Sequence, residues 1–295
     1  MYDYGNARVA ALRGRLLDPA ALRRLAEADS AGAFLALLER SEDWRPILRQ
    51  TEPLVIEPQG AVEASIERHR SARLGALVRF YPPPAQRLVE ALVLALDRER
   101  IVALVRRRLA GEPPEVIGAT IVGGALLDAA RLGALVRAPT LAALVRAIGR
   151  AGLIPTGEAI ELGRRVEQGI GRAELEARLA TAFEQGRIER AGGSDPNARA
   201  VRAILAREQA ERRAVAAELT AGGPGAAALL ERTLTLTRLD ELARTGRRDP
   251  LGIGPVAGYV AAVEAQAIRL RASLARVVGG WGHDLVGLYL SAARA

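Results

Sequence analysis

Side chains capable of catalysis are scarce in this chain. It contains two histidines and no cysteine, which excludes thiol nucleophiles, thiolate metal sites and disulfides. His283 stands beside Asp284 and near Ser291, and a Ser-His-Asp triad is defined by geometry rather than by chain order. No nucleophile-elbow pattern appears, however, and the glycines around His283 are typical of a loop between helices. We therefore interpret His283 as a loop residue, and His69, on the apolar stripe of a predicted helix, as a partly buried structural residue.

Metal and cofactor sites are equally weakly supported. Glu63 with Glu67, and Glu158 with Glu161, place acids on one helix face, as a carboxylate metal site requires. Arginines flank these acids and no Glu-x-x-His pairing exists, so we interpret them as surface ion pairs. All 42 basic residues are arginine, which removes the P-loop lysine and Schiff-base chemistry. Residues 252–258 resemble a dinucleotide loop, but no strand precedes them. We predict no catalytic residue, no metal and no cofactor.

The charge of the chain leaves two classes of partner open. The formal net charge is +8, which could attract nucleic acid, or an anionic membrane face and acidic proteins. Acidic residues are interleaved with the arginines along nearly every predicted helix, a pattern typical of solvated helix surfaces. Arg8, Arg13 and Arg15 interrupt any signal peptide. The longest apolar stretches, residues 91–96 and 119–127, are far shorter than the roughly 20 residues that span a bilayer. We therefore expect a chain that stays out of the membrane.

Hydrophobic spacing predicts helices throughout the chain. Aromatic residues make up only 3 %, so the core must consist of Leu, Val, Ile and Ala, a mixture that favours helix. Asp18-Pro19 and Pro139-Thr140 indicate helix starts, and the prolines at 82–84 and the Gly-Gly-Ser-Asp-Pro segment at 192–196 indicate breaks. Residues 85–110 form one long predicted helix, and a second is expected from Thr156 through Phe183. Residues 234–237 alternate like a strand but are too few for a sheet. The predicted fold class is all-α.

The two ends of the chain carry its most distinctive patterns. Residues 2–9, Tyr-Asp-Tyr-Gly-Asn-Ala-Arg-Val, run into an amphipathic helix. Residues 249–255, Asp-Pro-Leu-Gly-Ile-Gly-Pro, lead into a long helix that carries Tyr259, Glu264, Arg269 and Arg271. Together these segments resemble the C subunit of the rotary A/V-type ATPases, the family that includes the eukaryotic d subunit. The resemblance covers nearly the whole chain and is specific at its two ends.

This resemblance implies an architecture of three similar helical subdomains, arranged with pseudo-threefold symmetry as a funnel-shaped socket. A faint repeat supports it, because Asp97, Asp195 and Glu264 each begin a segment rich in Leu and Arg. The usual family pattern is blurred in these repeats, since Arg100-Ile101 stands where Asn-Ile is common. The expected subdomains are residues 1–84, which we expect to pack with the C-terminal helices, residues 85–191 and residues 192–295.

The resemblance also implies a function. Members of the family are non-catalytic subunits of the central rotor. One copy seats the shaft, made of D/F-type subunits, on the membrane ring of c/K/L-type proteolipids and transmits torque, at the cytoplasmic face of the membrane. The chain would touch the membrane only through the ring and would bind no nucleic acid. The interface candidates are, at one end of the funnel, Tyr4, Asn6 and Arg8 and, at the other, Tyr259, Glu264, Arg269 and Arg271. The alternative is a basic all-helical module that binds nucleic acid or serves as a scaffold, although aromatic stacking platforms are too few for the former.

Overall fold

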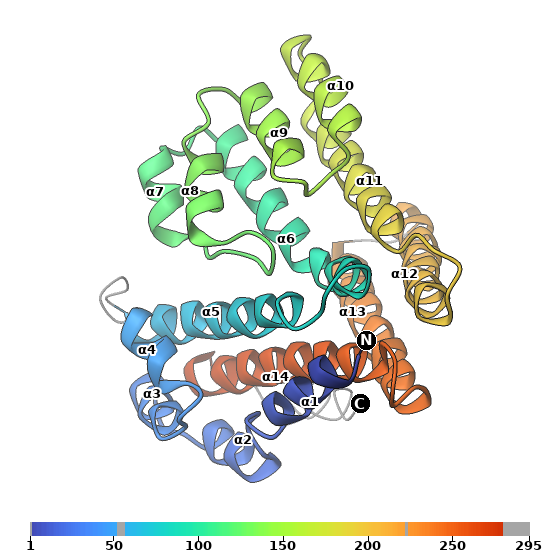
Figure 1. Ribbon diagram of the computed structural model, residues 1–295. Coiled ribbons are helices and arrows are strands. Elements are labelled where there is room, and N and C mark those ends of the chain that lie inside the picture. The colour runs from blue at the N-terminus through green and yellow to red at the C-terminus, as the bar shows by residue number, and fades with distance from the viewer. Residues whose placement is uncertain (1, 52–56, 222–223, 280–295) are drawn as a thin grey trace. The chain divides into compact units, whose positions relative to one another are not determined.

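The computed structural model describes residues 2–51, 57–221 and 224–279, and within these ranges the chain is helical and contains no strand (Figure 1). The all-α prediction is confirmed, and residues 234–237 lie inside a helix. The chain divides into two compact units. Unit 1 comprises residues 1–73 and 195–295, and unit 2 comprises residues 74–194. The division into subdomains 1–84, 85–191 and 192–295 stays a prediction.

Unit 1 takes its helices from both ends of the sequence, whereas unit 2 takes them from one continuous segment. Unit 1 contains α1 (Asp3–Arg13), α2 (Pro19–Ala26), α3 (Ala31–Glu39), α4 (Arg45–Thr51), most of α5 (Pro58–Val78), α12 (Pro196–Ala221), α13 (Pro224–Arg248) and α14 (Gly254–Gly279). Unit 2 contains the end of α5, α6 (Ala85–Leu109), α7 (Pro114–Thr120), α8 (Ala129–Val136), α9 (Leu141–Arg150), α10 (Thr156–Glu167) and α11 (Arg172–Arg190). None of the helices in the described ranges has an apolar stretch long enough to cross a bilayer.

One predicted helix is divided in the structure. The apolar spacing from Thr156 through Phe183 indicated a single helix, but α10 ends at Glu167 and α11 begins at Arg172. The connection contains Gly169 with a φ of 86°, a left-handed conformation that glycine adopts without a steric penalty. Gly171 then serves as the N-cap of α11. The prediction was wrong because the apolar period continues across the two glycines.

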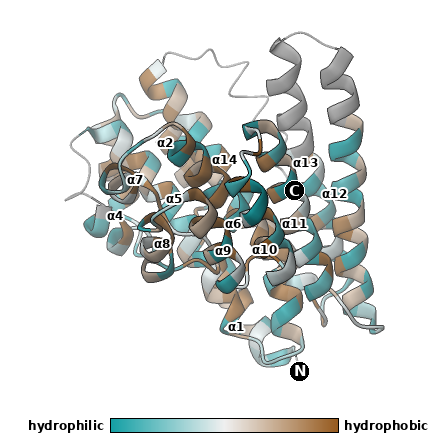
Figure 2. Cartoon of the chain, turned by 90° about the horizontal axis from the view of Figure 1, so that it is seen from above, coloured by the Kyte–Doolittle hydropathy of each residue, from teal (hydrophilic) through white to brown (hydrophobic). Residues whose placement is uncertain are grey.

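The core of unit 1 is built around α14. Helices α1, α2, α3 and α13 pack against α14. Helices α12 and α13 lie side by side (Figure 2). Most of the length of α14 is buried, which explains why its sequence is apolar on nearly every face. The buried apolar side chains that surround its C-terminal half are Leu22, Leu25, Phe34, Leu38, Trp44, Leu48, Val62 and Ile66, which meet Ala267, Leu270 and Leu274.

The core of unit 2 is built around α6. Helix α11 packs along α6, and α9 packs against both α6 and α10. Leu94, Ile101, Leu104 and Val105 of α6 are fully buried among side chains of α8, α9 and α11. A long helix enclosed by shorter helices is therefore the plan of both units.

Each unit contains a pair of short helices with the same caps. Asp18 and Asp128 begin α2 and α8, and each accepts a hydrogen bond from the backbone N–H three residues later, at 2.6 and 2.8 Å. Ser30 and Thr140 cap α3 and α9 in the same manner, at 3.1 Å in both helices. The spacing between the two caps is the same in both pairs, and so is the pattern of buried residues: Leu22, Leu25, Phe34 and Leu38 in one, Leu132, Leu135, Leu144 and Ile148 in the other. We call α2–α3 and α8–α9 the capped pairs.

Both capped pairs are tied to the long buried helix of their own unit at the same position. The backbone N–H of Leu17, just before α2, donates to Gln266 Oε1 of α14 at 2.7 Å. The backbone N–H of Leu127, just before α8, donates to Asp97 Oδ1 of α6 at 2.8 Å, and Leu126 N–H donates to both oxygens of Asp97 at 3.1 Å. The two units thus repeat one structural module with different side-chain acceptors.

Candidate docking site at the junction of the terminal motifs

The structure brings the two terminal motifs together within unit 1. Asn6 on α1 donates from Nδ2 to the backbone oxygens of Leu251 and Gly252, at 3.0 and 3.1 Å. These residues belong to the loop between α13 and α14, which is far away in the sequence. Because α1 also packs along α14, the first motif holds the loop that begins the last described helix.

The loop itself is fixed by polar side chains from two further positions. Asp249 Oδ1 accepts hydrogen bonds from Gly252 N–H at 2.8 Å and from Leu251 N–H at 3.3 Å. Asn197, at the start of α12, accepts one from Ile253 N–H at 2.8 Å. A Cβ at Gly252 would collide with the side chains of Asn197 and Asp249, so only glycine allows this close approach. The Asp-Pro-Leu-Gly-Ile-Gly-Pro motif is therefore a rigid turn.

Large side chains at this junction face solvent. Leu251 is 76 % exposed and Tyr4 is 67 % exposed, the two highest values among the large apolar side chains of the described residues. Arg8 lies one helical turn from Tyr4, and its guanidinium carbon is 5.9 Å from the centre of the Tyr4 ring, within the range of a cation–π contact. Tyrosine and arginine are the residue types most often found at the energetic centres of protein interfaces. We call Tyr4, Arg8 and Leu251 the junction residues.

Two carboxylates, those of Asp195 and Asp249, lie near the Tyr2 hydroxyl at this junction. Burial, together with the nearby carboxylates of Asp195 and Asp249, raises the pKa of the Tyr2 hydroxyl to about 12. Tyr2 therefore stays protonated at any physiological pH and can act as a hydrogen-bond donor there.

The C-terminal candidates lie along α14, mostly inside unit 1. Tyr259 is fully buried, its hydroxyl has no hydrogen-bond partner among the described residues, and burial raises its pKa. Glu264 is 5 % exposed, Arg269 is half-buried, and Arg271 forms an ion pair with Glu67 of α5. The structure thus places Tyr4, Asn6 and Arg8 at the junction and these four residues along the helix that the junction begins.

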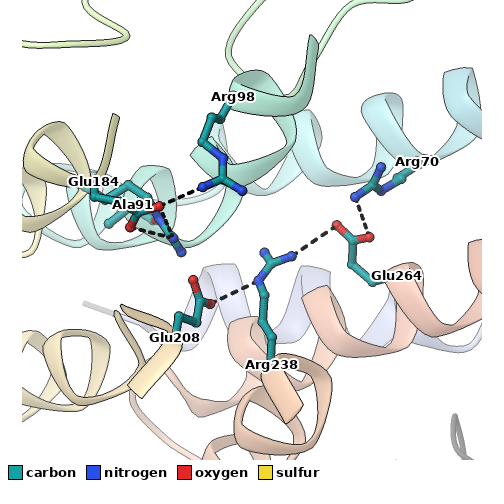
Figure 3. Close-up of polar contacts among 8 residues, drawn as sticks. Arg70, Ala91, Arg98, Glu184, Glu208, Arg238 and Glu264 are labelled. Atoms are coloured by element: carbon teal, nitrogen blue, oxygen red, sulfur yellow. Dashed lines mark hydrogen bonds and ion pairs between the residues drawn. The ribbon is translucent and has the colours of Figure 1, made fainter. Parts of the chain in front are cut away.

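Glu264 belongs to a buried chain of charges that the sequence did not reveal. Arg70 of α5 donates to Glu264 at 2.6 Å, Arg238 of α13 lies 4.0 Å from the same carboxylate, and Arg238 also pairs with Glu208 of α12 at 3.0 Å (Figure 3). These four side chains connect α5, α14, α13 and α12, and none is more than 12 % exposed. Removing one partner would leave a buried charge without compensation, so this charge chain fixes how the four helices sit in unit 1.

Unit 2 contains its own buried arginine. Arg187 of α11 is fully buried, pairs with Glu184 at 3.1 Å and donates from Nε to the backbone oxygen of Ala91 at 2.9 Å. Arg98 of α6 pairs with the same carboxylate of Glu184 at 3.2 Å (Figure 3). In unit 1 the corresponding Glu-x-x-Arg sequence, Glu67 with Arg70, likewise bridges a long helix to the central one. In the sequence, the buried Arg70 and Arg187 can be distinguished from exposed arginines only by their position on the apolar face of a helix.

His69 is structural, as predicted, and fully enclosed. It is 2 % exposed, its Nε2 lies 2.7 Å from Asp43 Oδ2, and its ring stacks on Trp44 with centroids 4.0 Å apart. Burial lowers the pKa of His69. Burial alone would raise the pKa of Asp43, but its hydrogen bond to His69 and the charge of Arg73 lower it overall. His283, Asp284 and Ser291 lie outside the described residues.

One acid of each predicted pair, Glu67 and Glu161, forms ion pairs with arginines. In the part of the chain that the structure describes, no group of three or more His, Asp or Glu side chains could hold a metal ion. Glu161 pairs with Arg164 and Arg165 on the surface of α10, at 2.8 and 3.0 Å. Glu67 differs from the prediction, because its side chain is 12 % exposed and its ion pairs lie within unit 1.

Two characterised proteins are similar to part of this chain. The A-type ATP synthase C subunit of Methanocaldococcus jannaschii is 25 % identical over 121 residues, which cover 41 % of this chain and 30 % of the relative. The A-type ATP synthase C subunit of Desulfurococcus sp. strain SY is 28 % identical over 112 residues, which cover 38 % of this chain and 30 % of the relative. The matched segments therefore span less than a third of either relative.

A family model covers more of the chain. The model of the ATP synthase (C/AC39) subunit matches residues 5–208, which include Asn6, both capped pairs and the start of α12. Since this match extends over more than half of the sequence, the chain belongs to the ATP synthase (C/AC39) subunit family.

Proposed function

We propose that this protein is a non-catalytic subunit of the central rotor of an A/V-type ATPase or ATP synthase. A single copy seats the shaft, made of D/F-type subunits, on the ring of c/K/L-type proteolipids, at the cytoplasmic face of the membrane. It transmits the torque that couples ATP synthesis or hydrolysis to ion translocation. The observation that carries this proposal is the family match over residues 5–208.

The construction of unit 1 supports a mechanical role. A connector that transmits torque must not deform, and close packing with buried polar ties supplies stiffness. The loop before α14 is held by Asn6, Asp249 and Asn197, and the charge chain joins four helices. In this proposal the three-subdomain funnel is the socket for the shaft.

The interface candidates take two roles in the proposal. Tyr4 and Arg8, together with Leu251, contact a neighbouring rotor subunit, because they are exposed on a rigid support. Asn6 positions the loop that presents Leu251. Tyr259, Glu264, Arg269 and Arg271 set the geometry of α14, since Tyr259 and Glu264 are buried and Arg271 is paired with Glu67.

Affinity capture of the tagged chain from gently solubilised native membranes, read by native mass spectrometry, tests the proposal. We expect one copy together with the shaft subunits and the proteolipid ring. The double variant Y4A/L251A should reduce this recovery about tenfold or more while leaving the circular dichroism spectrum unchanged, because both side chains are exposed.

Capture of other partners in this experiment would contradict the proposal. Recovery of nucleic acid, or of soluble proteins unrelated to the ATPase, would favour the basic binding or scaffold module. A salt series then separates these two outcomes, because nucleic-acid binding weakens steeply with salt.

A further inference from the structure

The capped pair of unit 1 lacks, within the described residues, a helix like the one that covers its counterpart. In unit 2, α10 packs along α9, where a Cβ at Gly149 would collide with Ala159 and a Cβ at Gly163 would meet Ala142 O at 3.4 Å. The contact positions on α9 are Ala142, Arg146 and Gly149, of which the first and last are buried.

The same positions of α3 face solvent. Counted from the shared N-caps, Ala142, Arg146 and Gly149 correspond to Gly32, Ala36 and Glu39, and all three of these are exposed. Most other positions of the two helices agree in burial: Phe34 and Leu38 are as completely buried as their counterparts, and only Leu35 is half-buried where Val145 is buried. The largest differences in burial therefore lie on the face on which α10 lies in unit 2.

A pocket opens next to this uncovered face. Its volume is about 290 Å³ and it is lined by Leu17, Ala21, Arg24, Leu25, Leu37, Arg40 and Ser41. Leu17 and Leu37 are half-buried and give an apolar floor, whereas Arg24 and Arg40 are exposed. Neither arginine has a carboxylate partner among the described residues. Two guanidinium groups can bind a carboxylate, and the apolar residues beside them can contact an aliphatic side chain next to that carboxylate.

Helix α10 shows which residues pack on the corresponding face of α9. It places Ala159 and Gly163 against α9, and its Glu167 pairs with Arg146 of α9 at 2.7 Å. Small residues for close approach and a carboxylate for an arginine are thus the features that seat α10.

We propose that the exposed face of α3 and the adjoining pocket bind an amphipathic helix of a neighbouring rotor subunit. Its small residues lie against Gly32 and Ala36, an aliphatic side chain enters the pocket, and a carboxylate lies between Arg24 and Arg40. This inference rests on the proposed function, which supplies the neighbouring subunit. The volume of the pocket is at the small end of the range for ligand sites. The uncovered face runs along the whole of α3, which favours a protein helix over a lipid as the occupant.

Arginine footprinting of the assembled rotor tests the occupant. Phenylglyoxal labelling, read by mass spectrometry, is compared between the isolated chain and the complex purified from membranes. We expect Arg24 and Arg40 to be protected about tenfold in the complex, and the exposed Arg23 of the same helix to change less than about twofold. Equal labelling of Arg24 and Arg40 in both samples, or equal protection of Arg23, would overturn the inference. Protection that vesicles of phosphatidylglycerol alone reproduce, and that delipidation of the complex removes, would assign the pocket to a lipid and overturn it too.

Substitution of an exposed residue provides the second measurement. Ala36→Trp places a large side chain on the uncovered face, and Arg23→Trp is its control on a neighbouring exposed position. Both variants should fold, and we expect Ala36→Trp to weaken assembly with the remaining rotor subunits about tenfold and Arg23→Trp to leave it unchanged. Normal assembly of Ala36→Trp contradicts this inference and leaves the proposed function intact. Failure of the unmodified chain to assemble with any rotor subunit contradicts both.

Discussion

The two capped pairs, α2–α3 and α8–α9, have equivalent caps and the same buried apolar positions, yet among the described residues one face is covered in unit 2 and open in unit 1. The cause lies outside the pairs. Helix α9 is followed by α10, which folds back along it, whereas α3 is followed by the short α4 and by Trp44, which enters the core and stacks on His69. Repetition of a module thus preserves its interior, and the next element of the chain decides which surface remains free for a partner.

The modules also differ in the chemistry that ties them to their central helix. Gln266 of α14 is neutral at every pH, whereas Asp97 of α6 can ionise. Burial raises the pKa of Asp97 to about 6, although the backbone N–H groups of Leu126 and Leu127 that donate to it act in the opposite direction. The same backbone turn is therefore insensitive to pH in unit 1 and sensitive to it in unit 2.

The largest difference between the units should follow removal of a buried arginine. Arg187→Met removes the ion pair with Glu184 and the bond to Ala91, so we expect unit 2 to lose about 4 kcal/mol of unfolding free energy. Arg70→Met should cost unit 1 less, about 3 kcal/mol, because the side chain of Arg70 is 6 % exposed whereas that of Arg187 is fully buried and also donates to a backbone oxygen. Urea unfolding combined with hydrogen exchange resolves the two units. Arg178→Met, in an exposed pair with Glu174, is the control and should cost under about 0.5 kcal/mol. Equal losses for the two buried arginines would contradict the comparison.

Removal of the side-chain acceptor should again affect unit 2 more strongly. Asp97→Leu leaves the N–H groups of Leu126 and Leu127 without their acceptor, at a cost of about 3 kcal/mol. Gln266→Leu leaves only Leu17 N–H, at a cost of about 1 kcal/mol. Exchange rates of these three amides report the local opening directly. A slower exchange at Leu127 in Asp97→Leu than in the parent chain would show that the carboxylate does not hold this turn.

A valine at matched positions of α9 and α3 tests whether the uncovered face is truly free. Gly149→Val forces α10 away from α9 and should destabilise unit 2 by about 2 kcal/mol. Glu39→Val, at the corresponding exposed position, should change the stability of unit 1 by less than about 0.5 kcal/mol. Thermal or urea unfolding of the isolated chain suffices. A large loss in Glu39→Val would show that another part of the chain covers α3.

The smallest expected effect is a difference in pH dependence. The folded-state pKa of Asp97 lies above its unfolded value, so its contribution is present at low pH and is lost as pH rises through about 6; unit 2 should lose about 1 kcal/mol between about pH 5 and about pH 7. The pKa of His69 is lowered on folding, so its contribution is present at neutral pH and is lost as pH falls below about 6.5. The pKa of Asp43 is also lowered, but its contribution is lost only as pH falls below about 4. Acidification should therefore loosen unit 1 around α5 and tighten the turn at Leu127. Hydrogen exchange at several pH values measures both, and Asp97→Asn should abolish the change at Leu127 while leaving that at α5.

Much of the fold was accessible from the sequence because local signals specify it. The long predicted helix at residues 85–110 is α6, which ends at Leu109, and Asp18 caps α2 as its Asp-Pro pattern indicated. These features depend on the spacing of apolar residues, on prolines and on helix-capping residues, all of which can be recognised within a short stretch of sequence. The boundary between α10 and α11 was missed because two glycines interrupt the backbone without interrupting the apolar period.

The candidate site was less accessible because its parts meet only in three dimensions. The family resemblance singled out both terminal motifs, but no local pattern shows that Asn6 binds the loop at Leu251. The charge chain was missed because Arg70, Glu208 and Arg238 resemble the many interleaved charges of the helix surfaces. The capped pairs could have been found, since Leu-Leu-Asp occurs at both 16–18 and 126–128, with Ser30 and Thr140 following at equal distances.

The discontinuity of unit 1 has a consequence for how the protein is made. Unit 2 is a continuous segment, whereas unit 1 needs residues 195–295 to complete a core that begins with Leu22, Phe34 and Leu38. Ribosomes add about 5–20 residues per second, so these apolar side chains lack their packing partners on α14 for on the order of ten seconds during synthesis. During that interval unit 2 can fold first, and the N-terminal helices are a natural client for chaperones.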